Sequence, residues 1–403
     1  MRWLTALFIL HSSFFILHSA KAQTLSPQTQ VSLITVGPGD DDISSAFGHT
    51  EIRIFDPALG FDQNYSYGGF DYDADSFVLK FLRGTLPYTL SVHNLYQVTA
   101  YYQRVNRSMT EQVLNLSQSQ KQQLFDALAK NYLPENRLYR YKFYHDNCST
   151  RPRDMIVQAA GDSIRFDPTA LDSTRSFRAW MNDYLGDWHW ARFGMNMAVG
   201  RPADERNSAW VAMWLPQNVF IQFQKATILQ PNGQRLPLVS ENRPLVVAQP
   251  EQPGILSTIL SPFIVFTAAF LLVVLLTRRQ RRLGQRGTRF DRFFFGFLGF
   301  WGWFLFLLWV ATDHGVTAWN PALLLMMPLH LPLIFWATRA SAPERTRRYF
   351  AITSVLALLF YAYALLHGYS YESLPLVLII LTRTLFHFGR RENEVQPATR
   401  ATA

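Results

Sequence analysis

The spacing of hydrophobic and polar positions divides this chain of 403 residues into three regions. An apolar run occupies residues 3–20, directly after a basic start at Arg2. Residues from about 28 to 250 combine short alternating stretches with polar turns, which is typical of a globular domain with strands and helices. From residue 255 onward, long apolar runs are separated by short polar connections. The pattern predicts an exported globular domain followed by a membrane region.

The globular region shows strand and helix patterns in mixed order. Residues 50–55 alternate polar and apolar side chains, as a half-buried strand does. Ser117 and Gln120 form a capping box that opens a helix extending to about Asn131. The other predicted strands are 31–36, 61–72, 86–92 and 138–144, and the other predicted helices run from a cap at Asp75 through Leu82 and from Pro152 to a stop at Gly161. We expect a mixed domain of helices and strands.

Five tryptophans lie between Trp180 and Trp214. Core packing is the first interpretation of this stretch. The alternative is a membrane-facing aromatic surface, because such rings favour the lipid–water interface.

Five apolar runs after residue 255 are candidate membrane spans: 255–277, 293–311, 322–338, 349–366 and 374–388. The first is long enough to cross a hydrocarbon core of roughly 30 Å. The last is the shortest and carries Arg383, which we expect to snorkel toward the cytoplasmic end. The sequence thus predicts an α-helical membrane bundle of about five spans over residues 255–389.

Basic residues are concentrated beside these apolar runs, and the formal net charge is +9. Seven arginines lie between Arg278 and Arg292, whereas the connections 312–321 and 367–373 contain no lysine or arginine. Because basic connections stay in the cytoplasm, the globular domain is placed outside and the tail, residues 390–403, inside. The distribution also argues against nucleic acid as a partner.

The N-terminal segment, residues 1–22, resembles a signal peptide. Its apolar run ends at Ala20-Lys21-Ala22, where small residues two positions apart suit a signal peptidase. An uncleaved anchor is the alternative, because the run is long and contains His11 and His18. In both cases the domain that follows, residues 23–250, is exported.

Cys148 is the only cysteine of the chain, which excludes an internal disulfide. It lies just before the helix predicted from Pro152, where the helix dipole and free N–H groups would lower a thiol pKa. Its neighbours are polar and charged, which favours a nucleophile. The alternative is a buried structural cysteine.

A nucleophilic thiol needs a base, and His49 is the best placed of ten histidines. It opens the predicted strand 50–55, and Gly48 before it allows close approach of another segment. His93, His145 and His189 are the other possibilities. His145 lies three positions before Cys148 and would instead support the loop.

Four motifs in order carry a family resemblance: Phe47–Arg53, Asn64–Asp71, Pro134–Tyr141 and Asp146–Asp154. They resemble the Lnb N-terminal periplasmic domain family of Bacteroidota, whose full-length members also have a C-terminal multi-span region. The resemblance implies an α+β papain-like fold in permuted order, with His before Cys, in the periplasm and attached to the inner membrane. It further implies a lipoprotein N-acyltransferase that moves an acyl chain from a phospholipid to the α-amine of a diacylglyceryl-cysteine lipoprotein. No cofactor or metal is expected.

By this resemblance Cys148 is the acylated nucleophile and His49 is its base. The third catalytic residue stays open among Asp71, Asn64 and Glu51, and turn formation is the alternative role of the first two. Substrate contacts are expected from three residues of the motifs, Tyr67, Arg151 and Arg153. The two arginines would hold a phospholipid phosphate or, alternatively, form caps and salt bridges.

The polar loop 312–320 lies at the external end of the predicted spans. Asp313 and His314 are candidates for lining the lipid or acceptor site, because ionisable residues at a span end are often functional. A loop that turns in water is the alternative. Two other functions remain possible for the chain: a Cys–His hydrolase of the cell envelope, and a non-enzymatic transport or assembly factor.

Overall fold

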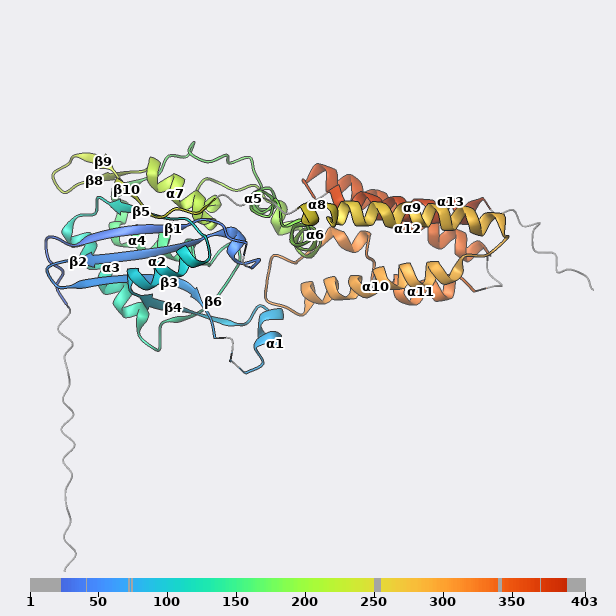
Figure 1. Ribbon diagram of the computed structural model, residues 1–403, viewed down its shortest axis with the longest axis horizontal. Helices are drawn as coiled ribbons and strands as arrows, with labels where there is room; N and C mark the ends of the chain where they lie inside the picture. The colour runs from blue at the N-terminus through green and yellow to red at the C-terminus, as the bar shows by residue number, and fades with distance from the viewer. Residues whose placement is uncertain are drawn as a thin grey trace, which may run out of the picture.

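A computed structural model describes residues 23–40, 42–71, 73, 75–249, 255–339, 343–369 and 371–389. The predicted signal segment, residues 1–22, and the predicted cytoplasmic tail, residues 390–403, lie outside these ranges. An N-terminal α/β region and a C-terminal helical region lie end to end (Figure 1).

The α/β region is built on a seven-stranded antiparallel sheet with the order β10-β5-β1-β2-β3-β4-β6. The two central strands, β2 and β3, pair so that Glu51 lies opposite Ser66 and Arg53 opposite Asn64. Strands of the sheet are β1 (Gln30–Val36), β2 (His49–Asp56), β3 (Phe61–Gly69), β4 (Pro87–His93), β5 (Met109–Leu114), β6 (Leu138–Arg140) and β10 (Val239–Val246). This register fixes which polar side chains share a face with His49.

Helices cover both faces of the sheet. The main core lies on one face, where Leu33 and Ile52 of the sheet pack with Leu124 of α3 (Gln118–Tyr132) and Ile156 of α4 (Thr150–Ala160). On the opposite face, α2 (Leu95–Arg104) packs with β1 and β5 in a smaller cluster. Because β-strand side chains alternate between faces, His49, Glu51 and Ser66 share the α2 face, whereas Thr50 and Tyr67 share the α3–α4 face.

A second cluster, rich in aromatic rings, connects the sheet to the helical region. It joins Phe47, Tyr144, Phe177 and Trp214, all buried. The elements that follow α4 in this region are β7 (Ile164–Arg165), α5 (Phe177–Tyr184), α6 (His189–Ala198), α7 (Pro216–Lys225), β8 (Thr227–Leu229) and β9 (Arg235–Pro237). Trp214 is a core residue, whereas Trp190 is half exposed and donates a hydrogen bond to the Leu260 carbonyl at the start of the membrane helices (2.7 Å). Both interpretations of the tryptophan-rich stretch therefore apply to different residues.

Local signals in the sequence give the ends of several elements correctly. The capping box is present, since Ser117 Oγ accepts from the Gln120 N–H and Gln120 Oε1 accepts from the Ser117 N–H. Gly161 ends α4 as predicted. The prediction that Asp75 caps the helix before Leu82 is wrong, because α1 (Phe77–Leu82) begins after Ser76 and has no side-chain cap. The predicted strand 138–144 ends at Arg140, where the chain turns toward Cys148.

The C-terminal region contains three helices long and apolar enough to cross a membrane: α9 (Pro262–Arg282), α10 (Thr288–Val310) and α12 (Pro343–Leu366). Five continuous spans are not confirmed. The predicted span 322–338 is divided into a short 3-10 turn, Pro321–Leu324, and α11 (His330–Ala337), with Pro328 between them. Proline lacks the N–H that a continuous helix requires. The last helix, α13 (Leu374–Phe388), has 15 residues, which corresponds to about 22 Å.

The prediction that Arg383 snorkels to an aqueous end is wrong. Its side chain is fully buried and pairs with Asp291 of α10, with Nε 2.6 Å from Oδ1. Thr277 and Gln280 of α9 accept further hydrogen bonds from Nη1, each at 2.9 Å. A buried partner of opposite charge removes the need to reach water, because it compensates the cost of taking the guanidinium out of water.

The connections 312–320 and 367–373 contact the α/β region directly. Asn320 donates to the carbonyls of Met197 and Ala198, and the Gly200 N–H donates to the Val316 carbonyl. Glu372 forms an ion pair with Arg192 at 2.7 Å and is almost fully buried. These are the two connections that lack basic residues, so the contacts agree with the predicted external placement of both.

Candidate active site

Cys148 lies at the point where the chain enters α4. The Asn147 side chain accepts hydrogen bonds from the backbone N–H groups of Ser149 (2.8 Å) and Thr150 (3.0 Å), which fixes the start of the helix. Asn147 is itself held by donation to the Phe143 and Trp214 carbonyls. The segment before Cys148 is therefore anchored on both sides, and the thiol is held in a defined position at the end of the sheet.

His49 is the first residue of β2. Gly48 before it has a φ of 77° and lies so close to β1 that a Cβ there would be 2.6 Å from the Val36 carbonyl oxygen. Any larger residue would push the histidine away from its neighbour strand. The His49 Nε2 atom lies 2.7 Å from Ser66 Oγ on β3, so one ring nitrogen is already engaged by the sheet.

Cys148 and His49 both border Gly68 of β3. A Cβ at Gly68 would lie 3.6 Å from the Cys148 Cβ, 3.3 Å from His49 Cε1 and 3.9 Å from His49 Nδ1. The φ of 136° at Gly68 is also one that side chains rarely adopt. Glycine leaves room here for both side chains, and the His49 nitrogen nearest to Gly68 is Nδ1.

Glu51 is the candidate third residue that the structure brings to His49. Its Oε1 lies 3.7 Å from His49 Nε2, and its side chain is 3% exposed. Ser66 Oγ hydrogen-bonds both His49 and Glu51 and so connects the two. The sequence analysis did not single out Ser66, although this residue lies in the motif Asn64–Asp71. The pairing of β2 with β3, which places Ser66 opposite Glu51, is the feature that reveals it.

Burial dominates the protonation of this site. It lowers the pKa of His49 to about 3, and it raises the pKa of Glu51 to about 7 against the opposing effects of the Ser66 hydrogen bond and Arg107. Burial also raises the pKa of the Cys148 thiol, although hydrogen bonds from Ser149, Tyr141 and two backbone N–H groups act in the opposite direction. The expectation that the helix start lowers this pKa is therefore wrong for the structure as it stands. At neutral pH a neutral thiol faces a neutral imidazole.

The other two candidates for the third residue lie apart from the ring nitrogen. Asp71 is exposed and accepts a hydrogen bond from the backbone N–H of Asp73, so it stabilises a turn. Asn64 is fully buried on the same face as Ser66, two positions along β3. Neither polar atom of its amide has a partner among the described residues. The geometry thus separates Glu51 from Asp71 and Asn64.

The predicted substrate contacts of the motifs have partners within the protein. Arg151 forms a bidentate ion pair with Asp146 (2.6 and 2.8 Å) and lies over the Tyr139 ring at 3.7 Å. Arg153 pairs with Asp154 and lies over Trp210 at 4.0 Å. The Tyr67 hydroxyl donates to Asn131 at 2.6 Å. In this state the three residues organise the loop around Cys148.

Asp313 and His314 connect the external loop to the α/β region. Asp313 Oδ2 pairs with Lys142 (2.8 Å) and Arg140 (3.2 Å), which precede Cys148 on the chain. His314 Nε2 lies 3.0 Å from the carbonyl oxygen of Leu82 at the end of α1. The two residues therefore hold the cysteine-bearing segment and α1 next to the membrane helices.

Two other candidate histidines, His145 and His93, do not border Gly68. His145 is exposed and its ring packs edge-on against Phe177. His93 is exposed and lines a cavity of about 290 Å³ on the α2 side of the sheet, together with Glu51, Ser66, Gln97, Val98, Tyr101 and Tyr102. Glu51 and Ser66 thus border this cavity.

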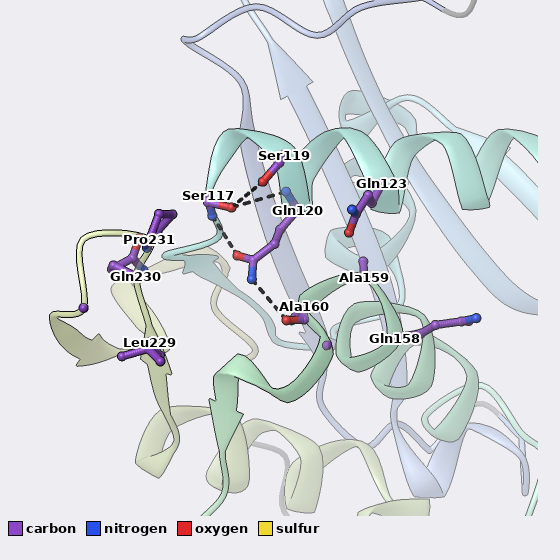
Figure 2. A pocket seen from close by; sticks show the side chains of 12 residues that line it. Ser117, Ser119, Gln120, Gln123, Gln158, Ala159, Ala160, Leu229, Gln230 and Pro231 are labelled. Carbon is purple, nitrogen blue, oxygen red and sulfur yellow. Dashed lines mark hydrogen bonds between the residues drawn. The ribbon is translucent and has the colours of Figure 1, made fainter.

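A larger hollow of about 560 Å³ lies at the opposite end of α4, between α3 and the β8–β9 turn. Figure 2 shows that it is lined by serines, glutamines and small residues, with Gln120 already bonded to the Ala160 carbonyl. No cysteine, histidine or carboxylate lines it. Within the described ranges, no group of three His, Cys, Asp or Glu side chains could hold a metal ion.

Two family models match the chain. The Lnb N-terminal periplasmic domain matches residues 19–180, which include His49, Glu51, Ser66 and Cys148. The Lnb transmembrane domain matches residues 255–392. The chain belongs to the Lnb family. Membership makes it a membrane protein with a periplasmic domain and indicates an enzymatic role in lipoprotein maturation. No protein of curated function and no solved structure matches the chain.

Proposed function

We propose that this Lnb-family protein is a lipoprotein N-acyltransferase that works through a thioester on Cys148. The observation that carries the proposal is that Cys148 and His49 both border Gly68, in an α/β domain fixed to membrane helices. A cysteine before a helix, packed on an antiparallel sheet that bears the histidine, is also the arrangement that supports a papain-like fold. The protein would lie in the inner membrane, with the active site in its periplasmic domain.

The hydrogen bonds around His49 favour its role as a base. A serine hydroxyl has one proton to donate. When Ser66 donates it to the Glu51 carboxylate, it accepts from His49 Nε2–H, and Nδ1 is left with a free lone pair on the Cys148 side. Glu51 and Ser66 thereby select the tautomer that can take the thiol proton. Ionised Glu51 also stabilises the imidazolium that forms.

The first half of the proposed reaction consumes a phospholipid. His49 removes the Cys148 proton, and the sulfur attacks the ester carbonyl carbon of the donor. The bond from that carbon to the glycerol oxygen then breaks, and His49 returns the proton to the departing oxygen. A lysophospholipid leaves and the acyl chain stays on sulfur as a thioester.

The second half transfers the acyl chain to an amine. The α-amine of a diacylglyceryl-cysteine attacks the thioester carbonyl and gives a proton to His49, and the C–S bond breaks to regenerate the thiol. The backbone N–H groups of Cys148 and Thr50 already point to the sulfur and would stabilise the oxyanion beside it. The N–H groups of Ser149 and Thr150 are occupied by Asn147.

Intact-mass measurement of lipoproteins tests this proposal. Cells with the protein should contain lipoproteins heavier by one acyl group than cells that carry Cys148→Ser at the same membrane level. Free fatty acid release without this mass gain would instead identify a hydrolase. Unchanged lipoprotein masses in the Cys148→Ser cells would contradict the thiol mechanism.

A further inference from the structure

The helix α1 presents an apolar surface that the described protein leaves uncovered. Four of its six residues are large hydrophobic side chains with high exposed fractions: Val78 67%, Leu79 57%, Phe81 51% and Leu82 43%. None of its residues is buried. Contiguous exposed apolar side chains of this kind mark an interaction surface.

Contacts with the loop 312–320 fix the position of α1. The Asp313 N–H donates to the Arg83 carbonyl at 2.8 Å, and His314 hydrogen-bonds the Leu82 carbonyl. Asp313 lies three residues after α10 ends at Val310, so α1 lies beside the external end of a membrane helix. Figure 1 shows α1 at the junction of the two regions, next to that end of α10. The surface of a lipid bilayer around α10 would therefore contact α1.

The charges on α1 match an interfacial location. Lys80 lies among the apolar residues in the last turn, and exposed Arg83 follows the helix directly. Basic side chains beside exposed apolar ones favour the headgroup region of a membrane, where phospholipid phosphates lie.

A row of aromatic rings leads from α1 to Cys148. The centroids of Phe81 and Phe77 are 6.2 Å apart, those of Phe77 and Phe70 are 5.9 Å apart, and those of Phe70 and Tyr88 are 5.2 Å apart. Tyr88 stacks on Tyr141 at 4.4 Å, and Tyr141 hydrogen-bonds the Cys148 thiol. The row is continuous from the uncovered surface to the sulfur.

We propose that α1 inserts its apolar face into the outer leaflet of the membrane and that the aromatic row guides the acyl chain of a phospholipid from there to Cys148. The occupant of this surface is thus the bilayer itself. The second part of the inference rests on the proposed function, whereas the insertion of α1 does not. The aromatic row would provide a route for the lipid, because the ester bond of a membrane phospholipid must reach a thiol in a periplasmic domain.

A fluorescence experiment tests insertion independently of activity. The chain has one cysteine, so Cys148→Ser leaves a protein into which Leu79→Cys can be introduced and labelled with an environment-sensitive dye. Leu59→Cys is the matched control, because Leu59 is 45% exposed in the turn at the opposite end of β2 from His49. In nanodiscs of phosphatidylethanolamine and phosphatidylglycerol, we expect blue-shifted emission and quenching by spin-labelled lipids at position 79 only. Water-like emission at 79, equal to that at 59, would overturn insertion.

A second experiment tests the delivery of the lipid. Leu79→Asp should reduce acyl transfer from phospholipid in nanodiscs by about tenfold or more, and Leu59→Asp should leave it unchanged. Transfer from a short-chain, water-soluble thioester or ester should be equal in both variants. Full activity of Leu79→Asp with membrane phospholipid would overturn the guiding role. If Cys148→Ser stays active while position 79 is quenched, the proposed function fails and the insertion of α1 stands.

Discussion

Two buried polar clusters of this protein differ in how completely their hydrogen bonds are formed. In the membrane region, Arg383 donates from all three nitrogens, to Asp291, Thr277, Gln280 and the Gly287 carbonyl. In the α/β region, Glu51 Oε2 and both polar atoms of Asn64 are buried and have no partner among the described residues. Arg383 and Asp291 are fully buried, whereas Glu51, although almost fully buried, borders a cavity of about 290 Å³.

The difference separates a structural cluster from a reactive one. A fully bonded ion pair holds charge in one arrangement and fixes helices relative to one another. An incompletely bonded cluster leaves Glu51 close to a change of protonation, as its pKa of about 7 shows. In the proposed mechanism, ionised Glu51 stabilises the imidazolium that forms when His49 takes the Cys148 proton. Substitutions in the two clusters should therefore have opposite effects on turnover and on stability.

The largest loss of turnover, after loss of the thiol itself, is expected for His49→Ala. A positioned general base typically contributes about 10²–10⁴-fold, and we expect a loss of this size in acyl transfer at unchanged membrane levels. His145→Ala is the control, because His145 is exposed and packs on Phe177 away from the sheet. Equal losses in the two variants would show that the base has been misassigned.

Glu51→Gln should have a smaller effect that depends on pH. A hydrogen bond to a charged group contributes about 1.5–3 kcal/mol, which corresponds to roughly 10–100-fold in rate. Because the pKa of Glu51 is raised to about 7, wild-type activity should rise with pH through this value, whereas the Glu51→Gln profile should stay flat there. Glu241→Gln, at an exposed site paired with Arg243, is the matched control. If Glu51→Gln shows the same pH dependence of activity as the wild type, Glu51 has no part in the mechanism.

The same substitution should raise stability increasingly as pH rises above the ordinary pKa of 4.5. The native protein binds a proton at Glu51 between the ordinary pKa of 4.5 and about 7, where the unfolded chain has released it. The free energy of unfolding contributed by this group therefore falls as pH rises through that window. Glu51→Gln removes this dependence, so its advantage over the wild type should grow from pH 4.5 to 7, as thermal unfolding in detergent would show.

Arg383→Met should have the smallest effect on chemistry and a large effect on stability. Removal of one partner leaves Asp291 buried without its ion pair, and such losses typically cost about 3–5 kcal/mol. The double variant Arg383→Met with Asp291→Leu should recover much of this loss. Turnover per folded molecule should match the wild type in both. A selective loss of turnover with normal stability would place this cluster in the reaction.

The sequence allowed several parts of this account to be predicted because their signals are local. A short apolar run indicated β1, alternation of side chains indicated β2, and the capping box indicated the start of α3. Gly48 before His49 indicated a close approach of another segment. Cys148 and His49 were proposed as a pair by motif and position, and both border Gly68 in the structure. These predictions needed no knowledge of which strands are neighbours.

Other parts depend on contacts between distant segments and could not be predicted. The link from Glu51 to His49 through Ser66 required the register of β2 against β3. The burial of Arg383 required the positions of Asp291, Thr277 and Gln280 on two other helices. The raised pKa of Cys148 reflects the depth of its site, which opposes the helix-start effect that the sequence shows. In each case tertiary packing decides between options that the local pattern leaves open.

The central claim is that the acyl chain passes through Cys148, and mass spectrometry of the protein tests it most directly. The full-length protein, incubated in nanodiscs with a phospholipid that carries a heavy-isotope acyl chain, should gain that chain on the peptide containing Cys148. The adduct should be labile to hydroxylamine and should disappear when a diacylated lipopeptide is added, with the label recovered on the lipopeptide amine. Labelled lipopeptide formed without an adduct on Cys148, or with an adduct on another residue such as Ser149, would contradict the account.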